Sequence, residues 1–558
     1  MVRLFEEQGD LFLAEELVPG EPLHLWQSAC AREGGPGPAE SAAMVAGLVA
    51  LVRTVHEAGF VIRDFKPHNV MVTPSGELRL IDTEYVTEAG RQCAPAYTRG
   101  FAAPEVRALG LHASAAESTA VAGAAADRFS LGVVLFSLLT GLDPRWAAGW
   151  TDGAGHRRDG QRVLPLIALS HPALPPYRPD AIDRLLDDGI AHLQRTMTPW
   201  RAALWPAPEW DVPRSDPCNT WNGAAGILAT LTHAARAVGG ASPLTTVAEA
   251  ARWLDERLFS ADRLLPGLCF GRSGTAWALL EDAAMADRAI ALVEQLPTRW
   301  PSPDVPHGLS GAGTACLHLW EATADESLLE AAFARADAVL DAADRRGGDW
   351  TWPTSRDTDS VLAGAHTYGF AHGTAGVGAF LLAASATALG AGDTLVRAAR
   401  VQEDRAAWPA EVGGEPHFRP STQWCNGPAG IGTFLIRLSA ATGVQRFADL
   451  AEQAAAAGVS DPWRAIAGEC SGNAGTGHFL LDMADFTGEA RYRTRAEGIA
   501  ALIEAQHCEA DGLRLVADAT SGSEYGNGAA GILDFLLRLR HGGTRPWTVS
   551  WPPGPPTP

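Results

Sequence analysis

Lysine is almost absent from this chain of 558 residues: of its 44 basic residues, only Lys66 is a lysine and the rest are arginine. Acidic residues outnumber basic ones by 65 to 44, so the formal net charge at pH 7 is −21. Nucleic acid and anionic membrane surfaces repel a protein of this charge, and we expect neither as a partner. A lysine retained in such a background indicates a position that arginine cannot fill.

Paired cysteine motifs and an export signal are also missing. The eight cysteines, at positions 30, 93, 218, 269, 316, 425, 470 and 508, form no C-x-x-C motif, and the N-terminus MVRLFEEQGD lacks the basic and apolar segments of a signal peptide. We therefore expect reduced thiols and a cytoplasmic location. The one long uncharged stretch, Gly373 to Gly392, is rich in Gly, Ala, Ser and Thr and predicts a buried helix rather than a membrane span.

The chain is 46% hydrophobic, which is enough for proper cores. Residues 1–195 mix helical patterns, such as Phe129 to Thr140, with short β-like runs at 11–13, 70–72 and 78–81. The segment 196–217 is rich in Pro and Trp and predicts a linker, whereas 218–541 is helical in pattern. We expect 542–558, which ends in WPPGPPTP, to be a disordered tail.

The helical region contains an internal repeat. The motif G-x-x-G begins at Gly223, Gly271, Gly308, Gly373, Gly427, Gly472 and Gly528. The fifth residue after the second glycine is Leu in six copies and Cys in one: Leu231, Leu279, Cys316, Leu381, Leu435, Leu480 and Leu536. Glycines at a helix entry permit tight turns and close backbone contact, and an apolar helix follows each motif. Seven helical hairpins predict a closed α/α toroid, with an open solenoid as the structural alternative.

In the first region, residues 62–69 read Ile-Arg-Asp-Phe-Lys-Pro-His-Asn, and Ile-Asp-Thr follows at 81–83. This order resembles the protein-kinase catalytic loop H-R-D-x-K-x-x-N and its metal-binding D-F-G, and A-P-E and D-x-W-S-x-G counterparts follow at 103–105 and 127–132. The resemblance implies that Asp64 meets the acceptor hydroxyl and that Lys66 faces the transferring phosphoryl group of ATP. Asn69 and Asp82 would hold Mg²⁺.

Ile62 replaces the histidine of this pattern, and Thr83 and Glu84 replace the Phe and Gly of D-F-G. Residues 6–17 resemble the last two strands of the small lobe and the hinge, so we expect a partial kinase-like domain, mostly C-lobe. The Gly-rich loop, the strand lysine and its glutamate partner would then lie before Met1, and phosphoryl transfer by this chain alone would be impaired. An inactive kinase remnant is the alternative.

The toroid region resembles the lanthionine synthetase C-like family in four motifs. These motifs are DVPHGLSG from Asp304, YGFAHGTAG from Tyr368, WCNGPAG from Trp424 and CSGNAG from Cys470. The resemblance implies an enzyme that adds substrate cysteine thiols to dehydroalanine or dehydrobutyrine. His372 would act as acid or base with Asp304 beside it, and Cys425 and Cys470 would be zinc ligands that activate the thiol.

Ser471 stands where the family has its third zinc ligand, and serine binds zinc poorly, so the zinc site is incomplete. His478 is the one residue nearby in sequence that could compensate. The alternative for the two cysteines is that they are small buried apolar residues, and for His372 that it is a hydrogen-bonded histidine at a helix start.

The order of kinase then toroid resembles class III and class IV lanthipeptide synthetases. It implies a ribosomally made precursor peptide as substrate and a partner chain that supplies the missing kinase lobe or a lyase. Two other functions fit less well: an inactive scaffold that binds a precursor or a partner synthetase, and a toroid hydrolase acting on carbohydrate. The hydrolase would need paired carboxylates, and Asp304 has no evident partner of that kind.

Overall fold

The computed structural model describes residues 3–7, 10–14, 17–32, 38–93, 98, 101–103, 106, 123–140, 174–205, 216–238, 241–259, 265–280, 285–355, 363–385, 387–414, 423–460, 462, 465–506, 508–509, 513–514 and 522–549. The chain divides into two compact units, Met1–Ala173 and Leu174–Pro558. Pro104 and Glu105 of the expected A-P-E motif lie outside the described residues.

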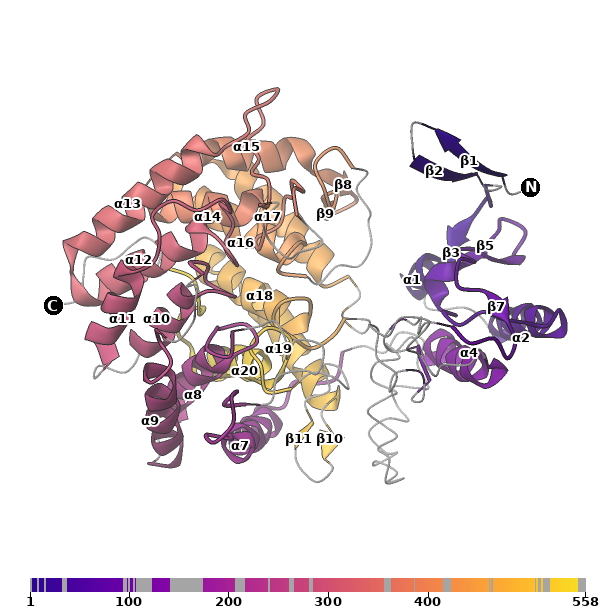
Figure 1. Ribbon diagram of the computed structural model, residues 1–558, viewed down its shortest axis with the longest axis horizontal. Coiled ribbons are helices and arrows are strands. Elements are labelled where there is room, and N and C mark those ends of the chain that lie inside the picture. The colour runs from indigo at the N-terminus through magenta and orange to yellow at the C-terminus, as the bar shows by residue number, and fades with distance from the viewer. Residues whose placement is uncertain are drawn as a thin grey trace. The chain divides into compact units, whose positions relative to one another are not determined.

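Among its described residues, the first unit combines three small antiparallel sheets, one of three strands and two of two strands, with three α-helices (Figure 1). Its elements are β1 (Arg3–Glu7), β2 (Asp10–Ala14), β3 (Glu21–Pro22), α1 (Leu23–Arg32), α2 (Pro38–Glu57), β4 (Phe60–Val61), η1 (Pro67–Asn69), β5 (Val70–Val72), β6 (Leu78–Leu80), β7 (Thr87–Glu88) and α4 (Ala124–Thr140). The strands and helix expected here from the sequence are present, and α4 begins five residues before the expected Phe129.

The core of this unit lies between α2 and α4. Met44, Leu48 and Val52 of α2 are buried together with Val134 and Leu138 of α4. Residues 39–57 of α2 are long and apolar enough to cross a membrane by length and composition alone. The buried stripe at spacing four is also what a helix packed on a soluble core requires.

The second unit is built from helix pairs. Seven helices begin directly after the first glycine of a repeat: α8 (Ala224–Val238), α10 (Arg272–Leu280), α12 (Leu309–Thr323), α14 (Thr374–Ala383), α16 (Pro428–Thr442), α18 (Asn473–Thr487) and α20 (Ala529–His541). Between them lie α9 (Ala241–Asp255), α11 (Ala286–Glu294), α13 (Glu326–Asp341), α15 (Leu389–Ala398), α17 (Gln445–Gly458) and α19 (Ala490–Gln506). Two small hairpins, β8 (Arg400–Gln402) with β9 (Arg405–Ala407) and β10 (Cys508–Glu509) with β11 (Leu513–Arg514), extend from loops.

The seven repeat helices form a closed ring. Each packs against the next, and α20 packs back against α8 (Figure 1). All seven side chains at the fifth position after the second glycine are fully buried in this ring. The expected toroid is therefore the observed architecture, and the open solenoid is not. The expected buried helix after Gly373 is α14.

The second glycine of each repeat is required by close backbone contact. A β-carbon at any of the seven positions would lie 1.8–2.1 Å from a carbonyl oxygen of the loop before the helix. That distance is far shorter than a carbon–oxygen contact allows, so any larger residue would push the loop away from the helix. The loops at the helix starts are thus held tightly against the ring.

The outer helix of the seventh pair is α7 (Pro179–Thr196), which precedes the first repeat in sequence. It packs against α20, and an ion pair joins Asp183 Oδ1 to Arg540 Nε at 2.6 Å. Its apolar residues, including Leu185 and Ile190, belong to the toroid core. The expected kinase boundary at 195 differs from the observed one because α7 buries its apolar face in the ring.

The segment after α20 returns to the ring instead of leaving it. The side chain of Arg545 is 2% exposed, and Trp547 packs edge-on against Trp277 of α10 and Tyr525. Residues 547–549 line a pocket together with Val305 and Phe370. The expected disordered tail is therefore ordered up to residue 549, and 550–558 lie outside the described residues.

Candidate functional site

A ring of backbone hydrogen bonds joins the loops at the helix starts. Each of these hydrogen bonds joins neighbouring repeats through the residue that lies two positions before the first glycine. The bonds run from Trp221 N to Cys269 O, Cys269 N to Pro306 O, Val305 N to Ala371 O, Ala371 N to Cys425 O, Cys425 N to Cys470 O, Cys470 N to Gly526 O and Gly526 N to Trp221 O, at 2.7–3.3 Å. Pro306 has no N–H, so Val305 donates in its place. We call the residues of this ring and those between it and the first glycines the mouth of the toroid.

The residue directly before each first glycine occupies one equivalent position around the mouth. These residues are Asn222, Phe270, His307, His372, Asn426, Ser471 and Asn527. The family's third zinc ligand position, Ser471, therefore corresponds by repeat to His307 and His372. Sequence reasoning selected His372 and missed His307, although Pro-His-Gly at 306–308 parallels Ala-His-Gly at 371–373.

Asp304 lies between the two histidines. His372 Nδ1 is 2.7 Å from Asp304 Oδ2, and His307 Nδ1 is 3.5 Å from the same oxygen. The other carboxylate oxygen accepts the backbone N–H of His307 at 3.1 Å. His307 stacks between Phe270 and His372, with ring centroids 4.9 Å and 5.4 Å apart. The structure thus brings together two residues expected from the sequence and one that was not.

The Asp304 carboxylate is strongly held in its charged form. Its side chain is 1% exposed, and this burial alone would raise its pKa. The hydrogen bonds from His307 and His372 outweigh the burial, so the pKa of Asp304 lies well below its usual range. A charged carboxylate on Nδ1 fixes the ring orientation and tautomer of a histidine, as in an acid–base pair.

Cys425 and Cys470 lie side by side in adjacent loops. The hydrogen bond between the two thiols lowers the pKa of Cys425 and raises that of Cys470. Cys425 Sγ is 3.9 Å from Ser471 Oγ, and within the described residues no third His, Cys, Asp or Glu joins the pair. A three-ligand zinc site needs that third donor, so the residues present do not fit the zinc site of the family pattern.

His478 does not compensate for Ser471. Its fully buried ring lies inside α18, where Nε2 is 3.4 Å from Asp534 Oδ2 and 3.8 Å from Glu469 Oε2. Arg538 approaches Nδ1 at 3.5 Å. His478 therefore belongs to a buried network of charges within the ring and not to the cysteine pair.

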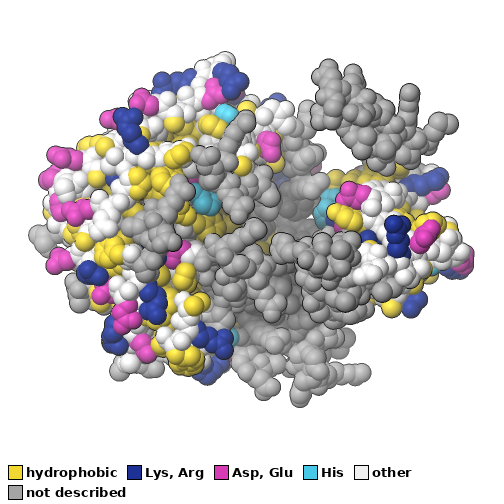
Figure 2. All heavy atoms as spheres, in the orientation of Figure 1, with side chains coloured by type: hydrophobic (Ala, Val, Ile, Leu, Met, Phe, Trp, Pro, Cys, Tyr) yellow, Lys and Arg dark blue, Asp and Glu magenta, His cyan; other side chains and the backbone are white. Residues whose placement is uncertain are grey.

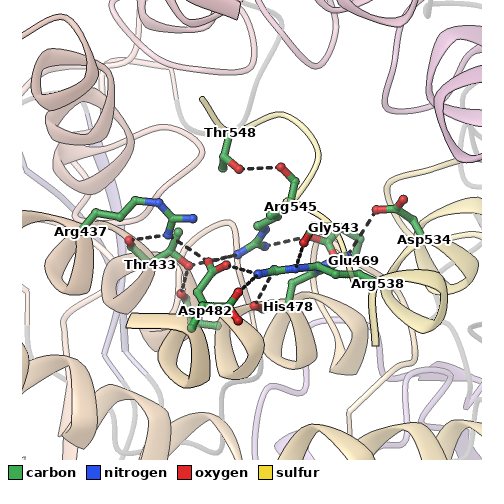
Figure 3. Close-up of polar contacts among 12 residues, drawn as sticks. Thr433, Arg437, Glu469, His478, Asp482, Asp534, Arg538, Gly543, Arg545 and Thr548 are labelled. Atoms are coloured by element: carbon green, nitrogen blue, oxygen red, sulfur yellow. Dashed lines mark hydrogen bonds and ion pairs between the residues drawn. The ribbon is translucent and has the colours of Figure 1, made fainter. Parts of the chain in front are cut away.

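Arg545, from the segment after α20, belongs to this network (Figure 3) and also contacts the two loops that carry the cysteines. Arg545 Nη2 lies 2.8 Å from Oε1 of Glu469, the residue that precedes Cys470. The Arg545 guanidinium also lies 5.6 Å from the ring of Trp424, the residue that precedes Cys425. The Asp482 carboxylate forms ion pairs with Arg437 at 2.9 Å and with Arg538 at 2.8 Å. One arginine from the chain end thus contacts the neighbours of both cysteines.

The kinase-like loop of the first unit is also assembled. Lys66 Nζ donates to Asp64 Oδ2 at 2.7 Å and to Thr98 Oγ1 at 2.8 Å. Asn69 Nδ2 donates to the Asp64 carbonyl at 3.1 Å. A lysine between a carboxylate and a hydroxyl is placed to neutralise charge where an acceptor hydroxyl would bind.

Asp82 lies two residues after β6, the strand that pairs with β5, and Asn69 lies directly before β5. Ile81 N donates to Asn69 O at 2.9 Å, and Val70 pairs with Leu80, so Asn69 and Asp82 lie at the same end of one hairpin. Asp82 is exposed and has a φ of 56°, an unusual backbone conformation outside glycine. The two expected Mg²⁺ ligands thus come from neighbouring chain segments.

Comparisons with known proteins identify both parts. The sequence matches the protein kinase domain over residues 1–180 and the lanthionine synthetase C-like protein over residues 214–550. The second match covers more than half of the chain. The chain belongs to the lanthionine synthetase C-like family. In this lanthionine synthetase C-like protein a kinase domain precedes the cyclase-type domain, and a kinase domain implies ATP and Mg²⁺.

Several curated relatives are protein kinases. The serine/threonine-protein kinase PknA of Mycobacterium tuberculosis is 29% identical over 42% of this chain and 55% of its own length. The serine/threonine-protein kinase PksC of Streptomyces coelicolor is 29% identical over 32% of this chain and 29% of its own. The chain thus spans about half the length of PknA and less than a third of the length of PksC. Among solved structures, nisin cyclase matches 66% of this chain and 95% of its own, at 16% identity and a TM-score of 0.49.

Proposed function

We infer that this chain modifies a ribosomally made precursor peptide, and that its helical unit closes thioether rings. The observation that carries the inference is the Asp304–His372 pair at the mouth, one loop away from Cys425. Within that unit, a cysteine thiol of the peptide adds to the β-carbon of a dehydroalanine or dehydrobutyrine. The sulfur–carbon bond forms while the double-bond electrons move to an enolate, which then takes a proton at the α-carbon.

The proton steps suit the Asp304–His372 pair. The buried Asp304 carboxylate lies 2.7 Å from Nδ1 of His372 and fixes the orientation of its ring. The imidazole can therefore take the thiol proton and return one to the enolate, so the proton count balances. A partly exposed side chain, 13% for His372, can meet a peptide at the mouth.

The kinase domain would prepare the same peptide. Asp64 would orient a Ser or Thr hydroxyl, Lys66 would neutralise the transferring phosphoryl group, and Asn69 and Asp82 would hold Mg²⁺ of ATP. Elimination of phosphate would give the dehydroamino acid, through a lyase activity from a partner chain. The protein would act in the cytoplasm, where its precursor is made.

The test uses a synthetic peptide that contains one dehydroalanine and one cysteine. Ring closure leaves the mass unchanged, so the remaining free thiol is trapped with N-ethylmaleimide and counted by mass spectrometry. The chain should accelerate thiol loss over buffer, and His372→Asn should abolish the acceleration. Equal thiol loss with the chain, the variant and buffer would refute cyclase activity.

A further inference from the structure

The enolate of the proposed ring closure carries its negative charge on the carbonyl oxygen of the former dehydroamino acid. His372 moves the protons of that reaction, but a proton carrier at the sulfur and the α-carbon does not itself stabilise the oxygen. Hydrogen-bond donors that face a developing oxyanion are usually the largest single contribution to the rate of such a reaction. A donor for this oxygen is therefore expected at the mouth, beside His372.

His307 occupies that place. His307 and His372 precede equivalent glycines at the starts of α12 and α14. Their ring centroids are 5.4 Å apart, and the planes of the two rings differ by 22°. His307 also stacks on Phe270, at 4.9 Å and 17°. A ring held between two others is fixed before a substrate arrives, and a donor placed in advance costs no reorganisation during the reaction.

Both imidazoles turn the same nitrogen toward Asp304. Nδ1 of His372 lies 2.7 Å from Asp304 Oδ2, and Nδ1 of His307 lies 3.5 Å from the same oxygen. The Nδ1 atom of His307 is buried, although 22% of the side chain is exposed. The carboxylate thus takes the Nδ1 edge of each ring, and Nε2 is the nitrogen left for a substrate.

The charge of Asp304 decides which imidazole is protonated. Its side chain is 1% exposed, and in the described part of the chain neither Arg nor Lys pairs with it. A buried carboxylate requires a positive partner. His372 must be neutral to accept the thiol proton, so the positive charge falls to His307. As an imidazolium, His307 donates from both ring nitrogens, and its Nε2–H suits an anionic oxygen.

We propose that His307 is a second catalytic residue of ring closure, and that its Nε2–H donates a hydrogen bond to the enolate oxygen. The inference rests on the proposed function and adds to it, because His372 keeps both proton steps. As the sulfur–carbon bond forms, the thiol proton passes to His372 and the double-bond electrons move to the carbonyl oxygen. Two imidazolium ions then face two anions, the Asp304 carboxylate and the enolate. His372 returns its proton to the α-carbon, the carbonyl group re-forms, and His307 is unchanged.

Two substitutions at His307 distinguish a hydrogen-bond donor from a packing residue. His307→Gln keeps an N–H donor and loses the ring, whereas His307→Phe keeps a ring between Phe270 and His372 and loses the donor. Both are assayed by thiol loss from the peptide with one dehydroalanine and one cysteine. His307→Phe should lower kcat by about 10²–10³-fold, as removal of one oxyanion donor does, with KM nearly unchanged. His307→Gln should retain more of kcat than His307→Phe, and a role in packing alone predicts the reverse order.

His233 provides the matched control. Figure 2 shows imidazole side chains at separate points on the described surface of the helical unit, so exposure alone does not mark a catalytic histidine. His233 matches His307 in environment, since each side chain is 22% exposed and each faces an aspartate that is 1% exposed. It lies within α8 and not at a helix start, and its partner Asp534 keeps Tyr525 at 3.0 Å. His233→Phe should therefore leave kcat unchanged. Urea unfolding of each variant checks that the chain remains folded.

Two results would overturn the inference and leave the proposed function intact. One is a His307→Phe variant that closes rings at the parent rate, and the other is a His307→Phe variant that retains more of kcat than His307→Gln. In both cases His372→Asn would still abolish the acceleration over buffer. A parent chain that gives no acceleration would instead refute the proposed function, and this inference with it.

Discussion

The two units each contain a buried aspartate paired with a histidine. In the kinase-like unit, His56 Nε2 lies 2.8 Å from Asp127 Oδ2, and Asp127 is fully buried. In the toroid, His372 Nδ1 lies 2.7 Å from Asp304 Oδ2, and Asp304 is 1% exposed. By distance and burial alone the pairs are equivalent.

Their surroundings separate them. Both oxygens of Asp127 also accept backbone N–H groups, from Ile62 and Arg63 at 2.7 Å each, so this carboxylate fixes the conformation of the kinase-like loop. Within the described part of the chain, Asp304 accepts a single, longer, backbone hydrogen bond, and its other oxygen faces two partly exposed imidazoles. A buried Asp–His pair serves the fold where backbone N–H groups occupy both oxygens of the carboxylate, as at Asp127. It can serve proton transfer where the carboxylate contacts accessible histidines, as at Asp304.

The sharpest way to break this comparison is Asp304→Asn. Loss of the charge that orients His372 should slow ring closure on the dehydroalanine peptide by about 10²–10⁴-fold, the usual range for general acid–base catalysis. The rate is measured from free thiol remaining. Asp127→Asn serves as the matched control and should leave that rate unchanged, because its carboxylate contacts the kinase-like loop. Equal loss in both variants would mean that Asp304 acts only through folding.

Removal of Arg545 tests whether the fold loses more stability at a buried carboxylate with one arginine partner, Glu469, than at one with several, Asp482. Among the residues that the structure describes, Arg545→Met leaves Glu469, which is 3% exposed, with one remaining ionisable partner, His478 at 3.8 Å. We expect a loss of about 3–5 kcal/mol in the free energy of unfolding, as for other broken buried pairs.

Arg437→Met is the matched control for Arg545. Asp482 keeps Arg538 at 2.8 Å after this change, so the loss should stay near 1–3 kcal/mol, roughly that of one charged hydrogen bond. Urea unfolding of both variants, followed by circular dichroism, gives the two values. A larger loss for the Arg437 variant would contradict this ranking.

The sequence predicts the closed ring of inner helices, but it does not predict that α7 is the outer helix of the seventh pair. The seven glycine motifs predict the inner helices because the second glycine is forced by contact with a carbonyl oxygen, as at Gly376. The helix α7 carries no such motif. Its pairing with α20 joins residues more than 300 positions apart, and only the packed structure reveals that contact.

The candidate site was predicted in part. Asp304 and His372 were found through family motifs, and the structure places them in contact. His307 stands in a position that the family motif leaves unspecified, so the motif hid it. Aligning the repeats with one another would have exposed it, because His307 and His372 precede equivalent glycines. Arg545 carried no signal, since its role depends on a chain end folding back.

Asp127→Ala should loosen the kinase-like loop locally. Two charge-assisted bonds to backbone amides and one to His56 are lost, and we expect the opening free energy of the loop to fall by about 2–3 kcal/mol. Hydrogen exchange at the amides of Ile62 and Arg63 reports this change directly. Exchange at Val305 in the toroid mouth is the internal control and should not change. Unaltered protection at both loop amides would show that Asp127 does not hold the loop.

Asp304 should also make the free energy of unfolding depend on pH in acid, and this is the smallest effect that we expect. The pKa of Asp304 lies well below its usual range in the folded chain, because its histidine hydrogen bonds outweigh its burial, whereas the unfolded carboxyl titrates near pH ~3.9. Below about pH 4 the unfolded state therefore binds one more proton than the folded state. The stabilising effect of Asp304 is complete above that pH and is lost as the pH falls toward the folded pKa. Its share of the slope is about 1.4 kcal/mol per pH unit. Urea unfolding between about pH 4 and pH 2 should show a slope shallower by that amount in Asp304→Asn, and an identical slope would mean that the carboxylate is not held in its charged form.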